Sequence, residues 1–334
     1  MSGWLDRLWY GRQRPLWFLW PLASLYRAIA RRRRQKALAD LAEQPPLTAP
    51  VIVVGNITAG GTGKSPLTAW LVSRLAEQGW RPVIITRGYG GKARHYPLRV
   101  TEGTDPAEAG DEPVMLARQC GCPVVVDPRR ARAARWALEQ DLGNVLVCDD
   151  GLQHYALARH LEIAVFDGQR GLGNGAPIPV GPLREGPERL DSVDFVVCNG
   201  RVPPGLEHPR THVMQLSPTQ LRHLRSGETR PVDWLMGKPV RAVAGIGNPA
   251  RFFETLNGLG ASVRPLALPD HHRFSRRDLA VGPGEILVMT AKDAVKCQGL
   301  AHEHCWVLEV TARLPESFRQ ALLHRLNRIH LNQA

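Results

Sequence analysis

The sequence predicts an α/β protein with a P-loop, a doubly wound and mostly parallel sheet, and a second, smaller α/β domain. Apolar runs of strand length alternate with segments whose apolar residues have helical spacing. A glycine-rich loop that ends in Gly63, Lys64 and Ser65 joins the first core strand to the first core helix. Polar residues follow directly after the apolar runs, where ligands bind in open parallel sheets.

The alternation gives the elements of the first domain in order. We expect a buried strand within residues 49–57, a helix after the glycine-rich loop, and a strand in "RPVIIT" that leads to a second glycine-rich loop at 87–92. A helix from about Glu112, a strand over 123–126, a helix from Pro128 and a strand over 144–148 follow. The runs "LEIAVFDG" and "VDFVVCNG" predict two more strands.

A chain of 334 residues is long enough for two domains. The pattern of strands and helices restarts near Lys238 and runs to a last helix at the end of the chain. Residues 201–237 show no clear period, so we expect a connection there, with some strand pairing possible. We therefore predict a membrane-associated helix and linker over 1–44, a P-loop core domain over 45–237 and a smaller α/β domain over 238–334.

The glycine-rich loop departs from the usual P-loop pattern by one residue. That pattern is G-x-x-x-x-G-K-[ST], and Thr58 stands where its first glycine is expected. Gly60 and Gly61 can still let several backbone N–H groups turn toward one anion. Lys64 would then lie beside the β- and γ-phosphates of a nucleotide, and the Ser65 hydroxyl would bind Mg²⁺. A plain glycine-rich connection is the alternative, but it gives the Lys-Ser pair at the helix start no packing purpose.

Further segments carry candidate catalytic side chains. "VLVCDD" ends in Asp149 and Asp150, and a P-loop enzyme needs an acid at such a strand end to hold Mg²⁺. Asp111 in "GDEP" precedes an apolar helix, where an N-cap is an equally good interpretation. His271 in "PDHHRF" is either a solvated loop residue or a side chain that orients a base on the first domain. Arg184 in "GPLRE" could contact an anion, whereas "GIGNP" and "TAKDAVK" could be ordinary turns.

The N-terminal segment combines tryptophans, an apolar run and a cluster of arginines. As a helix, the apolar run over 15–30 would extend about 24 Å, short of the roughly 30 Å of a hydrocarbon core. Aromatic residues suit the headgroup region and arginines suit an anionic leaflet. We expect a membrane-surface helix; an amphipathic helix packed on the protein's own core is the alternative. The tryptophans in question are Trp4, Trp9, Trp17 and Trp20.

Charge and cysteine content narrow the function classes. The formal charge is +12, but residues 1–36 hold nine Lys or Arg against one Asp, a net +8, which leaves +4 for the rest of the chain. A basic excess that lies mainly at one end argues against a nucleic-acid binder. The six cysteines show no zinc spacing, and Cys148 and Cys198 stand in strand-like runs, so we expect buried free thiols.

Taken together, the motifs identify a family. The chain resembles tetraacyldisaccharide 4'-kinase, the lipid A 4'-kinase of Gram-negative bacteria, along nearly its whole length. The resemblance includes the loop form T-x-G-G-T-G-K-[ST]-P, in which Thr58 is the family's residue. The family often has T-E-K-D-A-V-K near the C-terminus, where this chain has Ala291 in place of Glu. The matching motifs are "VGNITAGGTGKSP", "TRGYGG", "GDEP", "DDGLQH", "GPLRE", "GIGNPARFF", "PDHHRF" and "TAKDAVK".

The resemblance implies an ATP- and Mg²⁺-dependent kinase that phosphorylates the 4'-hydroxyl of an acylated glucosamine disaccharide 1-phosphate to give lipid IVA. It implies a location at the cytoplasmic face of the inner membrane through the N-terminal helix. We expect no nucleic-acid partner and no obligatory protein partner. By this match Asp111 is the general base and His271 its partner, Asp149 and Asp150 are metal-associated acids, and Arg184 contacts a phosphate. The nucleotide would lie on Thr58, Ala59, Gly60, Gly61, Thr62, Gly63, Lys64 and Ser65.

A second function class is compatible with the loop alone. A P-loop GTPase or ATPase switch, or a metal-insertion protein that acts through a protein partner, can carry the same "GGTGKS" string. A guanine-reading N-K-x-D motif would favour a GTPase, but "TAKDAVK" contains A-K-D instead.

Overall fold

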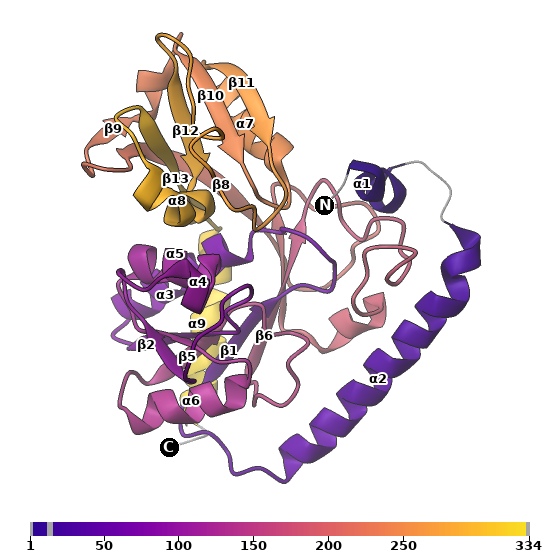
Figure 1. Ribbon diagram of the computed structural model, residues 1–334. Coiled ribbons are helices and arrows are strands. Elements are labelled where there is room, and N and C mark those ends of the chain that lie inside the picture. The colour runs from indigo at the N-terminus through magenta and orange to yellow at the C-terminus, as the bar shows by residue number, and fades with distance from the viewer. Residues whose placement is uncertain (1–2, 12–15, 332–334) are drawn as a thin grey trace.

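The computed structural model describes residues 3–11 and 16–331, and one sheet runs through both halves of this part of the chain (Figure 1). The strand order is β11-β10-β12-β13-β8-β7-β6-β1-β5-β2-β4-β3, with β9 beside β8. The strands are β1 (Val51–Gly55), β2 (Pro82–Thr86), β3 (Leu98–Val100), β4 (Val124–Val126), β5 (Val145–Cys148), β6 (Leu161–Asp167), β7 (Phe195–Asn199), β8 (Thr211–His223), β9 (Thr229–Pro231), β10 (Pro239–Ala244), β11 (Ser262–Ala267), β12 (Ile286–Thr290) and β13 (Cys305–Arg313).

The helices cover both faces of the core half of the sheet. Apolar residues of α3, α5 and α9 form one hydrophobic cluster with the sheet, and those of α6 form another with its other face. The helices are α1 (Gly3–Tyr10), α2 (Trp20–Ala42), α3 (Lys64–Glu77), α4 (Pro106–Ala109), α5 (Asp111–Cys120), α6 (Arg130–Glu139), α7 (Pro249–Gly258), α8 (Ala291–Cys297) and α9 (Glu316–Leu331), with short 3₁₀ turns at Trp17–Leu19, Pro187–Ser192, Val232–Leu235 and Gln298–Leu300.

The predicted doubly wound sheet is confirmed. Strands β1, β2, β5, β6 and β7 are buried along their whole length, as their unbroken apolar runs indicate. Their neighbours pair in parallel from β8 through to β4, and only the short edge strand β3 is antiparallel. The carboxyl ends of these strands, where the polar motifs stand, therefore lie at one edge of the sheet.

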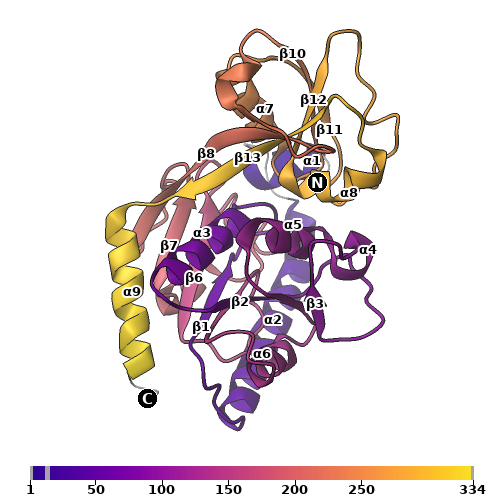
Figure 2. The same ribbon diagram turned by 90° about the vertical axis from the view of Figure 1, so that its left-hand side faces the viewer.

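Two long strands connect the halves of the molecule. Residues 211–214 of β8 pair in parallel with β7, and its remaining residues pair antiparallel with β13 of the second unit. Figure 2 shows β8 and β13 side by side between the two halves. Most side chains of β8 are only partly buried, so its sequence has no clear apolar period. After β13 the chain returns to the core, where Phe318 of α9 packs edge-on against Phe195 at 5.4 Å between ring centroids.

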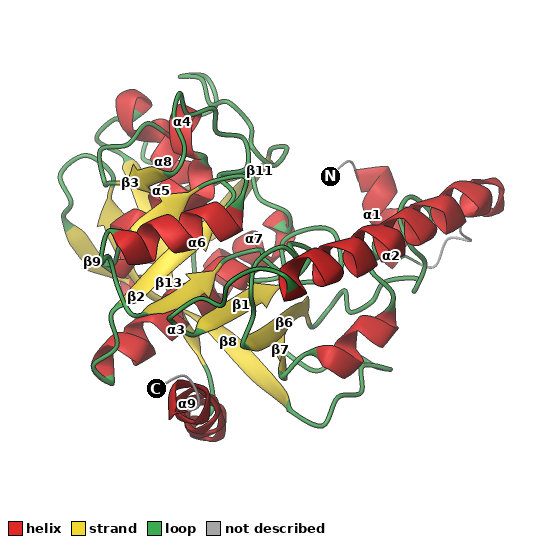
Figure 3. Cartoon of the chain, turned by 90° about the horizontal axis from the view of Figure 1, so that it is seen from below, coloured by secondary structure: helices red, strands yellow, loops and turns green. Residues whose placement is uncertain are grey.

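The two N-terminal helices differ in how they contact the rest of the protein. In α1, Leu8 and Trp9 are buried, and Nε1 of Trp9 donates a hydrogen bond to the Pro179 carbonyl at 3.0 Å. Trp9 is therefore a packing residue. In contrast, α2 buries only Ala23 among its described side chains and projects along one side of the molecule (Figure 3). Arg12, Arg14 and Pro15 of the predicted basic and apolar segment lie outside the described residues.

Within residues 3–11 and 16–331, no helix combines the length and apolar character that a membrane crossing requires. All six cysteines are free thiols, and Cys148 and Cys198 are buried, as expected. Burial raises the pKa of the Cys148 thiol to about 11 and that of Cys198 to about 12.

Candidate active site

The P-loop lies between the end of β1 and the start of α3. The backbone φ angles of Gly60 and Gly63 are 108° and 97°, values that residues other than glycine rarely adopt. Gly63 is the N-cap of α3, so the free N–H groups of the first helical turn, which includes Lys64 and Ser65, point toward the loop. The predicted strand, loop and helix are thus present, and they form an anion-binding geometry.

Lys64 lies beside the carboxylates that follow β5. Its Nζ is 3.4 Å from Oδ1 of Asp150 and 3.4 Å from Oδ1 of Asn56. Burial raises the pKa of Asp150, but the charges of Lys64 and Arg184 outweigh burial and lower the pKa to about 2. Asp150 is therefore ionised. It forms ion pairs with Lys64 and Arg184, the two cations that border the P-loop.

Asp149 differs from its neighbour because it is fully buried. Oγ1 of Thr68 donates to its Oδ1 at 2.9 Å, while its Oδ2 has no hydrogen-bond partner among residues 3–11 and 16–331. Burial, with the nearby charges of Glu112 and Asp150, raises the pKa of Asp149 to about 7. This buried carboxylate, on the residue before Asp150 and against Thr68 of the helix that follows the P-loop, matches the hard oxygen ligands that Mg²⁺ prefers. These residues fit a magnesium ion.

The "GPLRE" segment borders the same site. The backbone N–H of Arg184 donates to the Ile57 carbonyl at 2.7 Å, and its Nη1 lies 3.5 Å from Oδ1 of Asp150. Gln153 of "DDGLQH" donates from Nε2 to the Asn56 carbonyl at 2.9 Å. Both motifs are thereby hydrogen-bonded to the two residues that follow β1 and lead into the P-loop.

Asp111 and His271 come together from opposite halves of the molecule. Nδ1 of His271 lies 3.2 Å from Oδ2 of Asp111, and the His271 ring packs at a tilt of 48° against Tyr89 of the "TRGYGG" loop, with 5.0 Å between ring centroids. Gly110 is the N-cap of α5, so the alternative interpretation of Asp111 as the cap does not hold. The two histidines also separate in role, because His272 faces Asp278 at 3.3 Å.

Two lysines of "TAKDAVK", which the sequence left as an ordinary turn, also reach this site. Both stand on α8. Nζ of Lys296 is 3.6 Å from Oδ2 of Asp111, and Nζ of Lys292 is 2.9 Å from both Oε1 of Glu112 and Oδ1 of Asp270. Burial raises the pKa of Asp111, but the hydrogen bond with His271 and the charge of Lys296 hold it below its usual value. The sequence feature that could have indicated this role is the pair of lysines placed directly after an apolar strand.

The P-loop also has neighbours that the sequence did not indicate. The Tyr10 hydroxyl of α1 donates to the Ala59 carbonyl at 2.9 Å. Arg170 lies over the Tyr10 ring at 5.0 Å and donates to the Gly247 carbonyl at 3.0 Å. A Cβ on Gly247 would come within 2.5 Å of the Gly61 nitrogen, so only glycine permits "GIGNP" of the second unit to approach the P-loop this closely.

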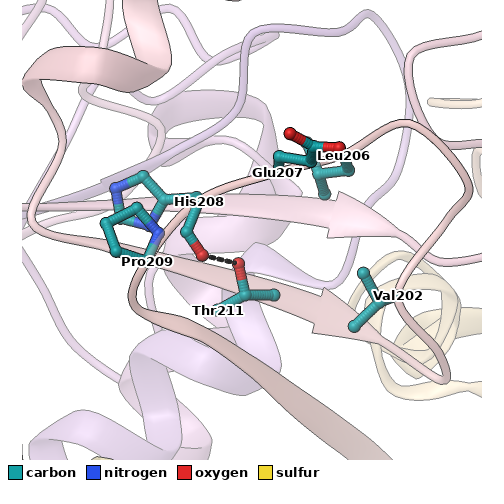
Figure 4. Close-up of a pocket in the computed structure, with 6 residues that line it drawn as sticks. All are labelled: Val202, Leu206, Glu207, His208, Pro209 and Thr211. Carbon is teal, nitrogen blue, oxygen red and sulfur yellow. Dashed lines mark hydrogen bonds between the residues drawn. The ribbon is translucent and has the colours of Figure 1, made fainter.

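Two cavities lie apart from the Asp111–His271 pair. The first, of about 320 Å³, separates α2 from the "GPLRE" segment, and Arg27, Arg31, Arg34 and Arg184 line it together with Tyr26. The second, of about 530 Å³, is shallow and contains none of the predicted site residues (Figure 4). It is lined by Val202, Leu206, Glu207, His208, Pro209 and Thr211.

Comparisons with known proteins agree with this arrangement. A family model described as "LpxK: Tetraacyldisaccharide-1-P 4'-kinase" matches residues 15–327. A curated tetraacyldisaccharide 4'-kinase of Aeromonas hydrophila is 46% identical over 96% of this chain and 96% of its own length. That of Alkalilimnicola ehrlichii is 48% identical over 93% of this chain and 92% of its own length.

A solved structure shares the fold. The crystal structure of LpxK from Aquifex aeolicus in complex with ATP superimposes with a TM-score of 0.78 at 29% identity, covering 92% of this chain and 98% of that one. Agreement in sequence and in fold over nearly the full length, with the motifs gathered at one edge of the sheet, leads to one assignment. The chain belongs to the LpxK family of tetraacyldisaccharide-1-phosphate 4'-kinases and is a kinase.

Proposed function

We propose that this kinase transfers the γ-phosphate of ATP to the 4'-hydroxyl of tetraacyldisaccharide 1-phosphate, with Asp111 as general base. The observation that carries the residue assignment is the 3.2 Å contact between Asp111 and His271 at the boundary of the two halves. Asp111 is buried and its pKa lies below the usual value, so it is ionised and able to accept a proton at neutral pH.

The reaction follows from the placement of these groups. Asp111 accepts the proton of the 4'-hydroxyl while the sugar oxygen forms its bond to the γ-phosphorus, and the bond from that phosphorus to the β,γ-bridging oxygen breaks to release ADP. His271 orients the Asp111 carboxylate through the hydrogen bond at Oδ2. Lys64 and the amides at the start of α3 stabilise the negative charge on the phosphates.

Ser65, Asp149 and Asp150 would hold Mg²⁺, which supplies charge neutralisation to the β- and γ-phosphates. Asp150 also keeps Lys64 and Arg184 at the loop, since both cations lie within 3.5 Å of its Oδ1. On this proposal, Lys64 would turn from Asp150 to the phosphates when nucleotide binds, and Asp150 would be free to hold the metal ion.

The membrane surface is the proposed location of the substrate and of α2. The apolar residues Leu22, Leu25 and Ile29 lie on one face of α2, at about 100° per residue, and are 52%, 55% and 44% exposed. Arg33 and Lys36 continue the same face. On this proposal the apolar stripe faces the acyl chains, while the basic residues of the helix face the headgroups. We place it at the cytoplasmic face of the inner membrane, where an anionic leaflet attracts its arginines.

The cavity between α2 and "GPLRE" supports this placement. Arg27 and Arg31 face Glu188 at 3.1 and 2.9 Å, so the inner face of α2 is basic and joined to the segment that carries Arg184. We assign this cavity to the phosphorylated headgroup of the lipid, with Arg184 as a phosphate contact.

One experiment tests the reaction. The purified full-length protein is incubated with γ-labelled ATP, Mg²⁺ and the disaccharide lipid in detergent, and label should appear in the lipid at the 4'-position. Asp111→Asn is the matched control, because it preserves shape and should bind ATP without transferring label. Label that remains in ATP, or that is released only as inorganic phosphate and never reaches the lipid, would contradict the proposal.

A further inference from the structure

Helix α8 presents a pair of lysines, one turn apart, to the first residues of α5. Lys292 and Lys296 are four positions apart, which places them on the same face of the helix. They meet two consecutive acids: Lys292 pairs with Glu112, and Lys296 faces Asp111. Their side chains are 13% and 10% exposed, so water screens these charges little.

The Lys296 ammonium lies between two carboxylates, one from each half of the molecule. It is 3.6 Å from Oδ2 of Asp111 and 3.1 Å from Oδ1 of Asp293, and it lies 5.0 Å over the Phe274 ring. Asp293 is itself fixed, because its Oδ2 accepts hydrogen bonds from Thr290 Oγ1 at 2.7 Å and from the Gly245 N–H at 2.9 Å. The second unit therefore places this cation, through its ion pair with Asp293, beside a carboxylate of the core.

We propose that Lys296 is a positioning residue that keeps Asp111 ionised and aimed at the substrate hydroxyl when the second unit rests on the core. The inference rests on the proposed role of Asp111 as general base. Lys296 does not touch the reacting atoms; it acts through the Asp111 carboxylate. The TAKDAVK motif thereby couples the arrangement of the two halves to the charge state of the base.

Other charged groups near Asp111 also influence its ionisation, in addition to Lys296. His271 comes from the 269–274 loop and Lys292 from α8, and both favour the ionised carboxylate. Nζ of Lys292 forms ion pairs with Glu112 and Asp270 at 2.9 Å each, so these two acids neutralise most of its charge. Lys296 is the cation of α8 that contacts Asp111 itself. An opposite charge at such a distance lowers a carboxyl pKa by about one to three units.

The pH dependence of turnover distinguishes this role from simple packing. Lys296→Met should raise the apparent pKa of the acid limb of kcat/KM by about one unit, because Asp111 loses the adjacent positive charge. Lys296→Arg retains the charge and should leave the acid limb where it is in the native protein. Lys292→Met is the matched control, since it removes an equally buried lysine of the same helix and should shift the acid limb much less.

The outcomes separate this inference from the proposed function. An equal loss of rate at every pH in Lys296→Met, with the acid limb unmoved, would overturn it, as would an equal shift in Lys292→Met. Asp111→Asn tests the base itself: near-normal turnover in that variant would refute the general-base assignment. An inactive Asp111→Asn together with an unmoved acid limb in Lys296→Met would refute the role of Lys296 alone. Thermal unfolding of each variant confirms that it is folded at the pH of the assay.

Discussion

Nδ1 of His271 lies 3.2 Å from Oδ2 of Asp111 although 160 positions separate the two residues in the chain. Asp111 begins a helix of the core, and His271, with φ of 61°, stands in a loop of the second unit. A non-glycine residue at positive φ carries a conformational cost, and such strain is maintained where the surrounding structure requires it. The pair therefore exists only while the two halves are in contact, which makes domain contact a condition for the proposed chemistry.

The first prediction concerns the unequal importance of this pair. Asp111→Ala should lower kcat by about 100- to 10,000-fold, the usual contribution of a general base. His271→Ala should lower kcat by a smaller factor, about 10- to 100-fold, because it removes a hydrogen bond to a charged group. Steady-state kinetics with varied lipid measures both. His272→Ala is the control from the same loop; if it lowered kcat as much as His271→Ala, the pairing would have no special role.

The second prediction concerns Lys64. Lys64→Ala should abolish turnover, because the ammonium group that faces Asp150 at 3.4 Å is the proposed charge partner of the β- and γ-phosphates. ATP affinity, measured by calorimetry in the presence of Mg²⁺, should fall as well. Lys92→Ala removes a lysine of another glycine-rich loop and should leave ATP affinity unchanged. Normal turnover in Lys64→Ala would exclude the P-loop as the nucleotide site.

The third prediction concerns the pH dependence of stability. The folded-state pKa of Asp149 is about 7, above an unfolded value of about 3.9. The folded protein thus binds more protons between these values, and this contribution to stability is lost as pH rises through about 7. The melting temperature of Asp149→Asn minus that of the native protein should therefore increase as the pH is raised from 5.5 to 7.5. Both proteins are measured without Mg²⁺ or nucleotide. A difference that stays constant with pH would contradict the raised pKa.

The fourth prediction concerns the apolar stripe of α2. Replacing Leu22, Leu25 and Ile29 with serine should release the protein from vesicles containing anionic phospholipid, because the buried apolar area supplies much of the binding. Cosedimentation measures the bound fraction. Leu38→Ser is the control, as Leu38 is 40% exposed on another side of the helix. An unchanged bound fraction in the triple variant would reject α2 as the membrane contact.

The triple serine variant changes only the apolar stripe of α2, whereas deletion of residues 1–36 removes α1 as well. The deletion should also release the protein from membranes, but it removes Tyr10, whose hydroxyl contacts the P-loop at Ala59. Loss of activity in the deletion variant would then have two causes. The serine variant leaves α1 in place and should retain ATP affinity.

The fifth prediction concerns that contact. Tyr10→Phe should weaken ATP binding about fivefold, because it removes one neutral hydrogen bond of about 1 kcal/mol. That hydrogen bond, to the Ala59 carbonyl, fixes the first half of the P-loop. Trp9→Phe removes the neighbouring hydrogen bond to Pro179, which is outside the P-loop, and should leave ATP affinity unchanged. Equal effects of the two variants would mean that α1 stabilises the protein generally and not the P-loop.

The sequence by itself determined what depends on local pattern. Unbroken apolar runs predicted the buried parallel strands, and Gly63-Lys64-Ser65 between a strand and a helix predicted the anion-binding loop. The expected fold class is confirmed. Residues 201–237 were expected to be a connection with some strand pairing possible, and the long strand β8 lies there; its half-buried side chains leave no apolar period. The functions of Asp111, His271, Asp149, Asp150 and Arg184, and the domain boundaries at 45 and 238, stay predictions.

Only the tertiary structure decided which side chains meet. Nothing in the local pattern of "TAKDAVK" indicates that Lys296 faces Asp111, and nothing near Tyr10 indicates a contact with Ala59. Such contacts join segments that are distant in the chain, and they depend on how helices and sheets pack over many residues. Local spacing records which face of an element is apolar, whereas the partner of a polar side chain is set by the packing of whole elements against one another.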